Sequence, residues 1–165
     1  MAKPVKKAEP PAAKKAAARP AAKKQTMPSY TVSTAKEITA TFSDSMGLTA
    51  KVARAVAAEN VNILAGTGYS ASGMRRKATF TLIVDDLAKA ERALERIGAE
   101  EIHESSVIIV EMANKVGALE RISSLIADAG INIYYFYSTT SCAKTATCVI
   151  KTEDDRKTIK ILQKA

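Results

Sequence analysis

The chain has no tryptophan, one histidine and only two cysteines among its 165 residues. A structural zinc ion takes four nitrogen, sulfur or carboxylate ligands, and His103, Cys142 and Cys148 alone do not supply them. The two cysteines are expected to be free thiols in a reducing cytosol, since disulfide-stabilised secreted domains carry more of them. We therefore predict neither a bound metal nor another cofactor.

Long apolar runs are also missing. No segment approaches the roughly 18 apolar residues that a membrane-spanning helix requires, and the first residues lack the apolar core of a secretory signal. The expectation is a soluble, cytoplasmic protein that does not bind membranes.

Proline and glycine divide the chain into two parts. All five prolines lie at or before Pro28, and all seven glycines lie at or after Gly47. Residues 1–30 carry eight basic residues and one acid, whereas the remainder carries 17 basic and 16 acidic residues. Because residues 1–34 are rich in Lys, Ala and Pro and have almost no large apolar side chains, they are expected to form a disordered tail. This tail is either a solvated spacer or a polycation that contacts nucleic acid non-specifically through residues 1–30.

Internal repeats indicate two copies of one unit in the rest of the chain. Three segments return in the second half: Asp44-Ser45-Met46-Gly47 as Asn114-Lys115-Val116-Gly117, Asn60-Val61-Asn62-Ile63 as Gly130-Ile131-Asn132-Ile133, and Thr79-Phe80-Thr81-Leu82 as Thr147-Cys148-Val149-Ile150. The first two pairs are 70 residues apart and the third is 68 residues apart. The shared order of these segments predicts the same fold for both copies.

Each copy has the pattern strand, helix, strand, strand, helix. The first is expected to have strands near residues 38–42, 61–70, 76–84 and 100–104, and the second near residues 107–110, 131–140 and 145–151. Asp44 or Ser45 is expected to cap the first helix, and Asn60 and Gly130 to end helices in the left-handed conformation. No fourth strand is expected in the second copy, which would leave one edge of its sheet unpaired unless another chain or the first unit covers it.

The repeated units resemble the ACT domain, the regulatory amino-acid-binding module of several metabolic enzymes. The resemblance lies in an Asp or Asn, two further residues and a Gly that opens a helix, followed some fifteen residues later by Val-Asn-Ile or Ile-Asn-Ile. It implies an α+β fold of two tandem ferredoxin-like βαββαβ modules with antiparallel sheets, at residues 35–105 and 106–165, that pair side by side. It also implies a non-catalytic regulatory protein that binds a small amino acid between modules.

The chemistry of the repeated loop suits a free amino acid. Backbone N–H groups at the start of a helix favour a carboxylate, and an asparagine side chain both donates and accepts, as a zwitterion requires. The predicted ligand-binding residues are Asp44, Ser45, Met46, Gly47, Leu48, Asn62 and Ile63 in the first copy, and Asn114, Lys115, Val116, Gly117, Ala118, Asn132 and Ile133 in the second. Taken singly, each of these residues also has an ordinary structural role as a cap, a turn or a backbone-bonding side chain.

No catalytic motif was found, so an enzyme is not expected. The acids at residues 85–86 and 153–155 each begin a second helix, where capping explains them better than metal binding. The aromatic run 134–137 should place one pair of rings in the core and leave the other exposed or at an interface. A contact between modules or copies is favoured for the second pair over a ligand-binding role. The expected partners are an amino-acid ligand and either a second copy or a regulated enzyme in trans. The alternatives are a docking subunit that binds no ligand, or a nucleic-acid-associated protein that acts through its basic tail.

Overall fold

A computed structural model describes residues 30–71, 76–142 and 144–165. The elements follow one another as β1 (Tyr30–Ser43), α1 (Leu48–Ala58), β2 (Ile63–Ala71), β3 (Lys77–Val84), α2 (Leu87–Arg96), β4 (Glu101–Ala113), α3 (Ala118–Asp128), β5 (Ile133–Cys142), β6 (Thr145–Thr152) and α4 (Asp155–Lys164). The fold is therefore α+β, as expected from the sequence. Within the described residues, no helix is long and apolar enough to cross a membrane.

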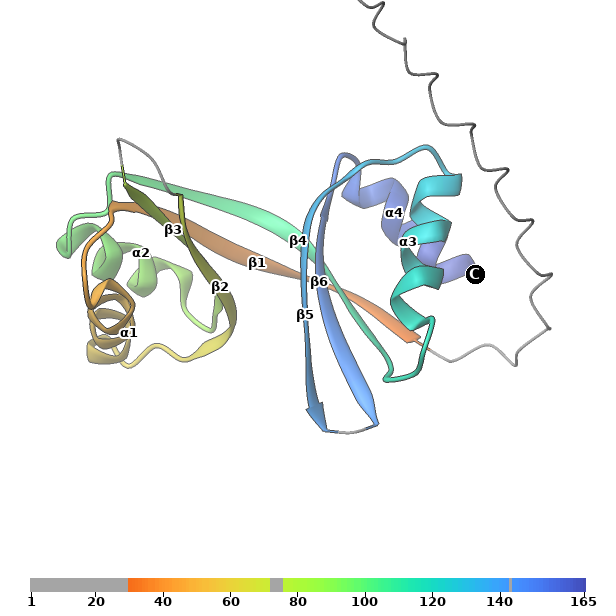
Figure 1. Cartoon of the computed structure of the whole chain (residues 1–165), viewed down its shortest axis with the longest axis horizontal. Coiled ribbons are helices and arrows are strands. Elements are labelled where there is room, and N and C mark those ends of the chain that lie inside the picture. The colour runs from red at the N-terminus through yellow and green to blue at the C-terminus, as the bar shows by residue number, and fades with distance from the viewer. Residues whose placement is uncertain (1–29, 72–75, 143) are drawn as a thin grey trace, which may run out of the picture.

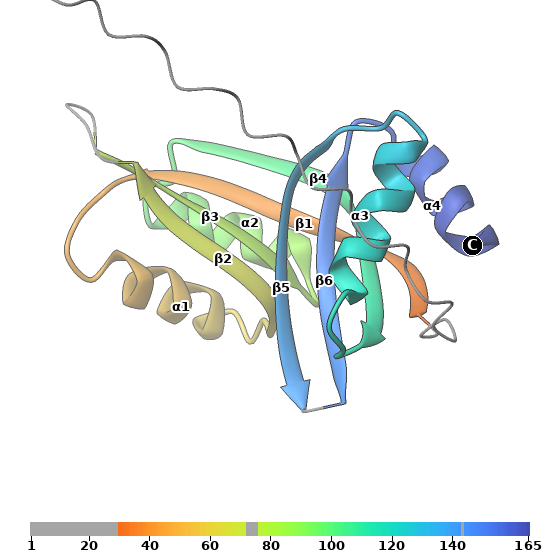
Figure 2. The same ribbon diagram turned by 45° about the vertical axis from the view of Figure 1, so that its right-hand side comes forward.

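All six strands of the described chain form one antiparallel sheet in the order β2-β3-β1-β4-β6-β5. The order β2-β3-β1-β4, with α1 and α2 in the connections, is that of a ferredoxin-like unit. Read from its other end, the sheet has the matching order β5-β6-β4-β1, with α3 in the connection from β4 to β5 and α4 after β6. The helices lie at the two ends of the molecule, α1 and α2 at one end and α3 and α4 at the other (Figures 1 and 2).

Two long strands join these halves. β1 and β4 pair over twelve positions, from Tyr30 opposite Met112 to Thr41 opposite Glu101. The predicted strands at residues 100–104 and 107–110 are thus parts of the single strand β4, because no Gly or Pro interrupts the backbone between them. Lys36 lies opposite Ser106, its own counterpart in the repeat, so an approximate two-fold axis passes through this pair.

The beginning of β1 bears on two predictions. Residues 30–34, which were assigned to the disordered tail, form the first part of this strand, while residues 1–29 lie outside the described residues. The same segment pairs with Ile108–Met112 of β4. The edge that was expected to stay unpaired unless another chain or the first unit covers it is thus covered by the first unit, because β1 is long enough to serve both halves.

Each half has its own core between helices and sheet. In the first, Val52, Val56 and Leu94 of the helices pack against strand residues such as Ile38 and Phe42. In the second, the same arrangement is formed by Ile122, Ile126, Leu162, Ile108 and Ile150. The buried and exposed positions of residues 32–40 recur without change at residues 102–110, which confirms that the repeat in the sequence is also a repeat in packing.

A third apolar cluster contains no helix residues and lies on the open faces of the sheet, defined here as those turned away from the helices. We call it the junction. It consists of three fully packed residues and four partly buried ones: Ile83, Val107, Val149, Ala35, Ala65, Ile109 and Tyr137. Since these residues come from all six strands, the junction fixes how the two halves pack on each other.

Candidate functional site

The two predicted ligand loops have the same backbone geometry. Gly47 and Gly117 are the N-cap residues of α1 and α3, with φ angles of 81° and 87° in the left-handed region, which suits glycine. Neither helix has a side-chain cap, so the prediction that Asp44 or Ser45 caps α1 is wrong. The Asp44 carboxylate instead accepts a hydrogen bond from Ser70 at the end of β2.

The amide groups of these loops are only partly available to a ligand. The Leu48 and Ala118 amides donate to the carbonyl groups of Ser45 and Lys115, at 3.2 and 3.1 Å, and both side chains are buried. Leu48 and Ala118 thus serve the core as well as the helix starts. Met46 and Val116, which directly precede the two glycines, have apolar side chains that are fully exposed.

The predicted asparagines lie at the other end of the same helices. Asn62 and Asn132 precede β2 and β5 and have exposed side chains. Their backbones are tied to the start of the second helices, since the Asn62 amide donates to the Asp85 carboxylate at 2.9 Å and the Asn132 carbonyl accepts from the Glu153 amide at 2.9 Å. The backbones of both asparagines are therefore held in place, while their amide side chains remain accessible.

A single half does not bring its loop and its asparagine together. α3 has 11 residues between Gly117 and the turn before Asn132, and a helix of that length spans about 16 Å. The loop at residues 114–117 is instead tied to the turn after β5, where the Asn114 amide donates to the Lys144 carbonyl at 2.9 Å. Within one chain, the loop thus lies at the end of β5 and Asn132 at its beginning.

A groove of ligand size runs between α3 and β5. Its volume is about 570 Å³, and it is lined by Leu119, Ser123, Ile133, Tyr134, Tyr135, Phe136 and Ile150. A smaller hollow beside it, of about 340 Å³, is lined by Asn132, Ser124 and other residues and shares Ser123 and Ile133 with the groove. Sequence reasoning missed Ser123 and Ser124, although two consecutive serines in an amphipathic helix next to the predicted asparagine were a usable signal.

β5 is an end strand of the sheet and is unusually apolar for that position. Its sequence contains no charged residue, whereas edge strands commonly carry charges that prevent pairing with other chains. Tyr134, Tyr135 and Phe136 are 60%, 38% and 52% exposed. The prediction that one pair of this aromatic run lies in the core is therefore wrong, and only Tyr137 is packed into the junction.

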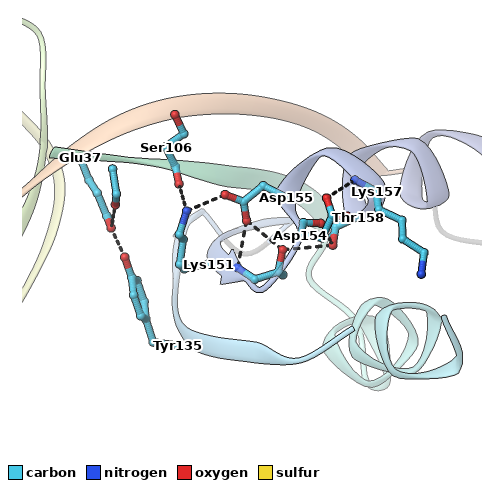
Figure 3. Close-up of polar contacts among 10 residues, drawn as sticks. Glu37, Ser106, Tyr135, Lys151, Asp154, Asp155, Lys157 and Thr158 are labelled. Carbon is cyan, nitrogen blue, oxygen red and sulfur yellow. Dashed lines mark hydrogen bonds and ion pairs between the residues drawn. The ribbon is translucent and has the colours of Figure 1, made fainter. Parts of the chain in front are cut away.

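A buried polar cluster, which the sequence did not reveal, lies beside the junction. The Glu37 side chain of β1 is fully buried and accepts hydrogen bonds from the Ser105 hydroxyl, at 2.9 Å, and from the Tyr135 hydroxyl. Nearby, the Lys151 ammonium donates to the Ser106 carbonyl at 2.8 Å and to the Asp155 carboxylate at 2.6 Å (Figure 3). The Lys151 contact contributes to lowering the pKa of Asp155, against the effect of burial.

The remaining ionisable groups among the described residues include two helix caps and a buried thiol. No group of three or more His, Cys, Asp or Glu side chains there could hold a metal ion. Asp86 and Asp154 accept from the Lys89 and Lys157 amides and cap α2 and α4, which confirms the capping prediction. Burial raises the pKa of the Cys148 thiol to about 11, which leaves it protonated and unreactive at neutral pH.

Comparison with protein families gives a match in the second half of the chain. Residues 106–165, which hold β5, the groove and the second loop, match the model of the ACT domain. No curated protein matches the chain.

Several solved structures share the fold. Protein BT0572 from Bacteroides thetaiotaomicron is 25% identical, with a TM-score of 0.70 over 81% of this chain and 89% of that one. The regulatory subunit of aspartate kinase from Thermus thermophilus, in a ligand-free form, is 18% identical, with a TM-score of 0.58 over 82% and 95%. A structure of aspartokinase alpha and beta subunits is 19% identical, with a TM-score of 0.57 over 81% and 95%.

Proposed function

We propose that this chain is a non-catalytic regulatory protein with two tandem ACT-type units that binds a small amino acid where units of two copies meet. The ACT match of residues 106–165 and the ferredoxin-like strand order of both halves support it. The observation that carries it is the position of Asn132, an exposed amide at the start of an uncharged end strand and beside a groove of ligand size.

The second copy is needed to complete the site. If the β5 strands of two copies pair antiparallel, the beginning of one strand lies opposite the end of the other. Asn132 of one copy then faces the loop at residues 114–117 of the second copy, because that loop is tied to the turn after β5. Such a contact uses the same surface on both copies and closes as a two-fold dimer.

Each part of the assembled site has a matching part of the ligand. The amides of Val116 and Gly117, at the positive end of α3, receive the carboxylate. The side chains of Asn132 and of Asn114 from the second copy bind the ammonium group. The groove receives the side chain, and its apolar lining favours aliphatic or aromatic amino acids over charged ones.

The first half supplies a second, equivalent set of residues. Residues 44–48 of the loop, with Asn62 and Ile63, have the same geometry around β2, the other end strand of the sheet. β2 contains Gly66 and Gly68 at positions where β5 has Phe136 and Ser138, so its edge offers less apolar surface. We assign the stronger contact and the stronger site to β5.

A thermal-shift screen against the twenty amino acids, each at about 10 mM, tests this proposal. A ligand present at about 100 times its dissociation constant stabilises the folded state by about 2.7 kcal/mol. For a domain of this size, that corresponds to an increase in the unfolding midpoint of about 5 to 10 °C. A reproducible shift with a few related apolar amino acids is expected, and a flat response to all twenty would contradict ligand binding.

The edge of β5 also favours a second candidate function, a docking subunit that binds a regulated enzyme in trans without a ligand. An uncharged, aromatic end strand can receive a strand of another protein. This function requires β5 and the groove but neither asparagine. An Asn132→Ala variant that still binds its protein partner with unchanged affinity would favour it over amino-acid sensing.

A further inference from the structure

The buried carboxyl group of Glu37 is not explained by its surroundings. Its side chain is 0% exposed and lies beside the junction, whose members are almost all apolar. An ionised carboxylate in such a place is costly unless it is fully paired. A fold that needed only a filled space here would be better stabilised by an apolar residue.

The repeat provides that apolar alternative within the same molecule. Glu37 corresponds to Val107, which is also 0% exposed. Its polar neighbours likewise correspond to apolar residues at the repeat spacing: Ser105 to Ala35, Tyr135 to Ala65 and Lys151 to Ile83. One side of the two-fold axis is therefore apolar and the other polar, although the backbone pairing is the same.

The hydrogen bonds around Glu37 are incomplete. Ser105 and Tyr135 both donate to one carboxylate oxygen, Oε1. The other oxygen, Oε2, and the Tyr137 hydroxyl are buried and form no hydrogen bond of good geometry in the described part of the chain, although the two groups lie near enough to influence each other's pKa. After a small rotation of either side chain, the Tyr137 hydroxyl can accept from a protonated Oε2 or donate to an ionised one, and the donation partly offsets the effect of burial.

Few charges compensate an ionised Glu37. From β6, Lys151 attracts it, but the ammonium group is already bound to Asp155 of α4 and to the Ser106 carbonyl. From β5, Tyr135 and Tyr137 contribute neutral hydroxyls, and β2, β3 and β4 contribute the uncharged Ala65, Ile83 and Val107. Burial is accordingly the largest influence, and it raises the pKa of Glu37. Burial, together with the neighbouring carboxylate, raises the pKa of Tyr137 as well.

We propose that Glu37 is a proton-controlled latch between the two halves of the molecule. The neutral carboxyl group holds the open faces of the sheet together around Tyr135 and Tyr137. Loss of its proton favours opening of the junction, because the charge gains water when the halves separate. The latch depends on the junction residues alone, so it stands whether or not an amino acid binds at Asn132.

Tyr135 connects the buried Glu37 to the groove at the surface. This residue bonds Glu37 with its hydroxyl and also lines the groove between α3 and β5. Opening of the junction releases the Tyr135 hydroxyl and loosens one wall of the groove. By thermodynamic reciprocity, whatever binds in the groove and orders Tyr135 must also favour the protonated, closed junction.

Urea denaturation of the full chain between pH 4.5 and pH 8 provides the first test. A carboxyl group with a raised pKa in the folded state stabilises that state below its ordinary pKa, and this contribution is lost as the pH rises through the raised value. We compare the folding equilibrium constant of wild type with that of Glu37→Gln. Between the ordinary and the raised pKa, the ratio of wild type to variant should fall by up to about tenfold for each pH unit. The matched control is Glu104→Gln, an exposed carboxylate on the neighbouring strand, 3.7 Å from Lys36, and its ratio should stay constant.

Hydrogen exchange tests where the opening occurs. After correction for the intrinsic rate, amides of residues 133–136 should exchange faster with rising pH in wild type but not in Glu37→Gln. Amides of α1, which lies far from the junction, should show no such difference. Equal pH dependence in wild type and variant at residues 133–136 would overturn the latch.

A titration that needs no substitution keeps the test independent of how the variants fold. The chemical shift of the Glu37 side-chain carboxyl carbon, followed by ¹³C NMR as the pH changes, should give a pKa above the ordinary glutamate value of about 4.3. Tyr137→Phe, which removes the unpaired hydroxyl, should move that midpoint. A Glu37 midpoint at the ordinary value would show that the carboxylate is solvated and would overturn the proposal.

Discussion

Replacement of Tyr134 by serine should separate two copies of the chain. Tyr134 is 60% exposed on β5, and a tyrosine side chain has roughly 200 Å² of accessible surface, so about 120 Å² is open to solvent. If pairing of the β5 strands covers half of this area, each copy gains about 1.5 kcal/mol at 25 cal/mol per Å². A two-fold dimer makes the contact twice, so the substitution should weaken dimerisation by roughly 3 kcal/mol, or about 100-fold.

The repeat offers a matched control. Leu64 of β2 is the counterpart of Tyr134 and is 61% exposed. Leu64→Ser thus removes a similar fraction of exposed apolar surface from the other end of the same sheet. Neither Tyr134→Ser nor Leu64→Ser should alter the free energy of unfolding of the monomer by more than about 0.5 kcal/mol.

Sedimentation equilibrium over a wide range of protein concentration measures the effect. Wild type and Leu64→Ser should share one dissociation constant, and Tyr134→Ser should have a much larger one. An equal loss in both variants would indicate pairing of β2 with β5 instead. An unchanged dissociation constant for Tyr134→Ser, or a wild type that stays monomeric at all concentrations, would refute the proposed contact.

Three further predictions concern single residues. Asn132→Ala should weaken binding of the amino acid found by the screen at least about tenfold in calorimetric titration, since a hydrogen bond to a charged group is lost. Asn62→Ala should have a smaller effect, because we assign the stronger site to β5. Gly117→Ala should lower the free energy of unfolding by about 1–2 kcal/mol in urea denaturation, because its φ of 87° is unfavourable for alanine while the added Cβ meets no other atom. Asp154→Ala should lower the free energy of unfolding by about 1 kcal/mol, because the Lys157 amide loses the Asp154 carboxylate to which it donates at the start of α4.

The fold could be predicted from the repeat, but the connection between the halves could not. The spacing of 70 residues located equivalent helices, loops and strands, and Asn60 and Gly130 have the left-handed conformation that was expected. Ser105 and Ser106, however, fall between the two strands that were predicted at residues 100–104 and 107–110. In the structure, both lie inside β4, opposite Glu37 and Lys36 of β1. Pairing between strands more than sixty residues apart is a tertiary contact that local patterns do not encode.

The candidate site was predicted in its residues more than in its arrangement. The glycine loops and exposed asparagines are present, but Asp44 does not cap α1, because Ser70 of another strand engages its carboxylate. Leu119 of α3 is 38% exposed and lines the groove, which the sequence did not indicate. Glu37 was not singled out, since an acid in a strand is ordinarily a surface residue. Only the packing of the two open faces makes it a buried one.

A mixing experiment with two inactive variants tests the central claim, that the amino-acid site is assembled from two copies. Asn132→Ala and Asn114→Ala should each lose affinity for the amino acid found by the screen, since each lacks one side of the site. After unfolding and refolding as a mixture, dimers with one chain of each kind contain one intact site, so binding at the wild-type dissociation constant should return. If the mixture binds no better than either variant alone, while wild type binds normally, the site lies within one chain and the proposed interface is wrong.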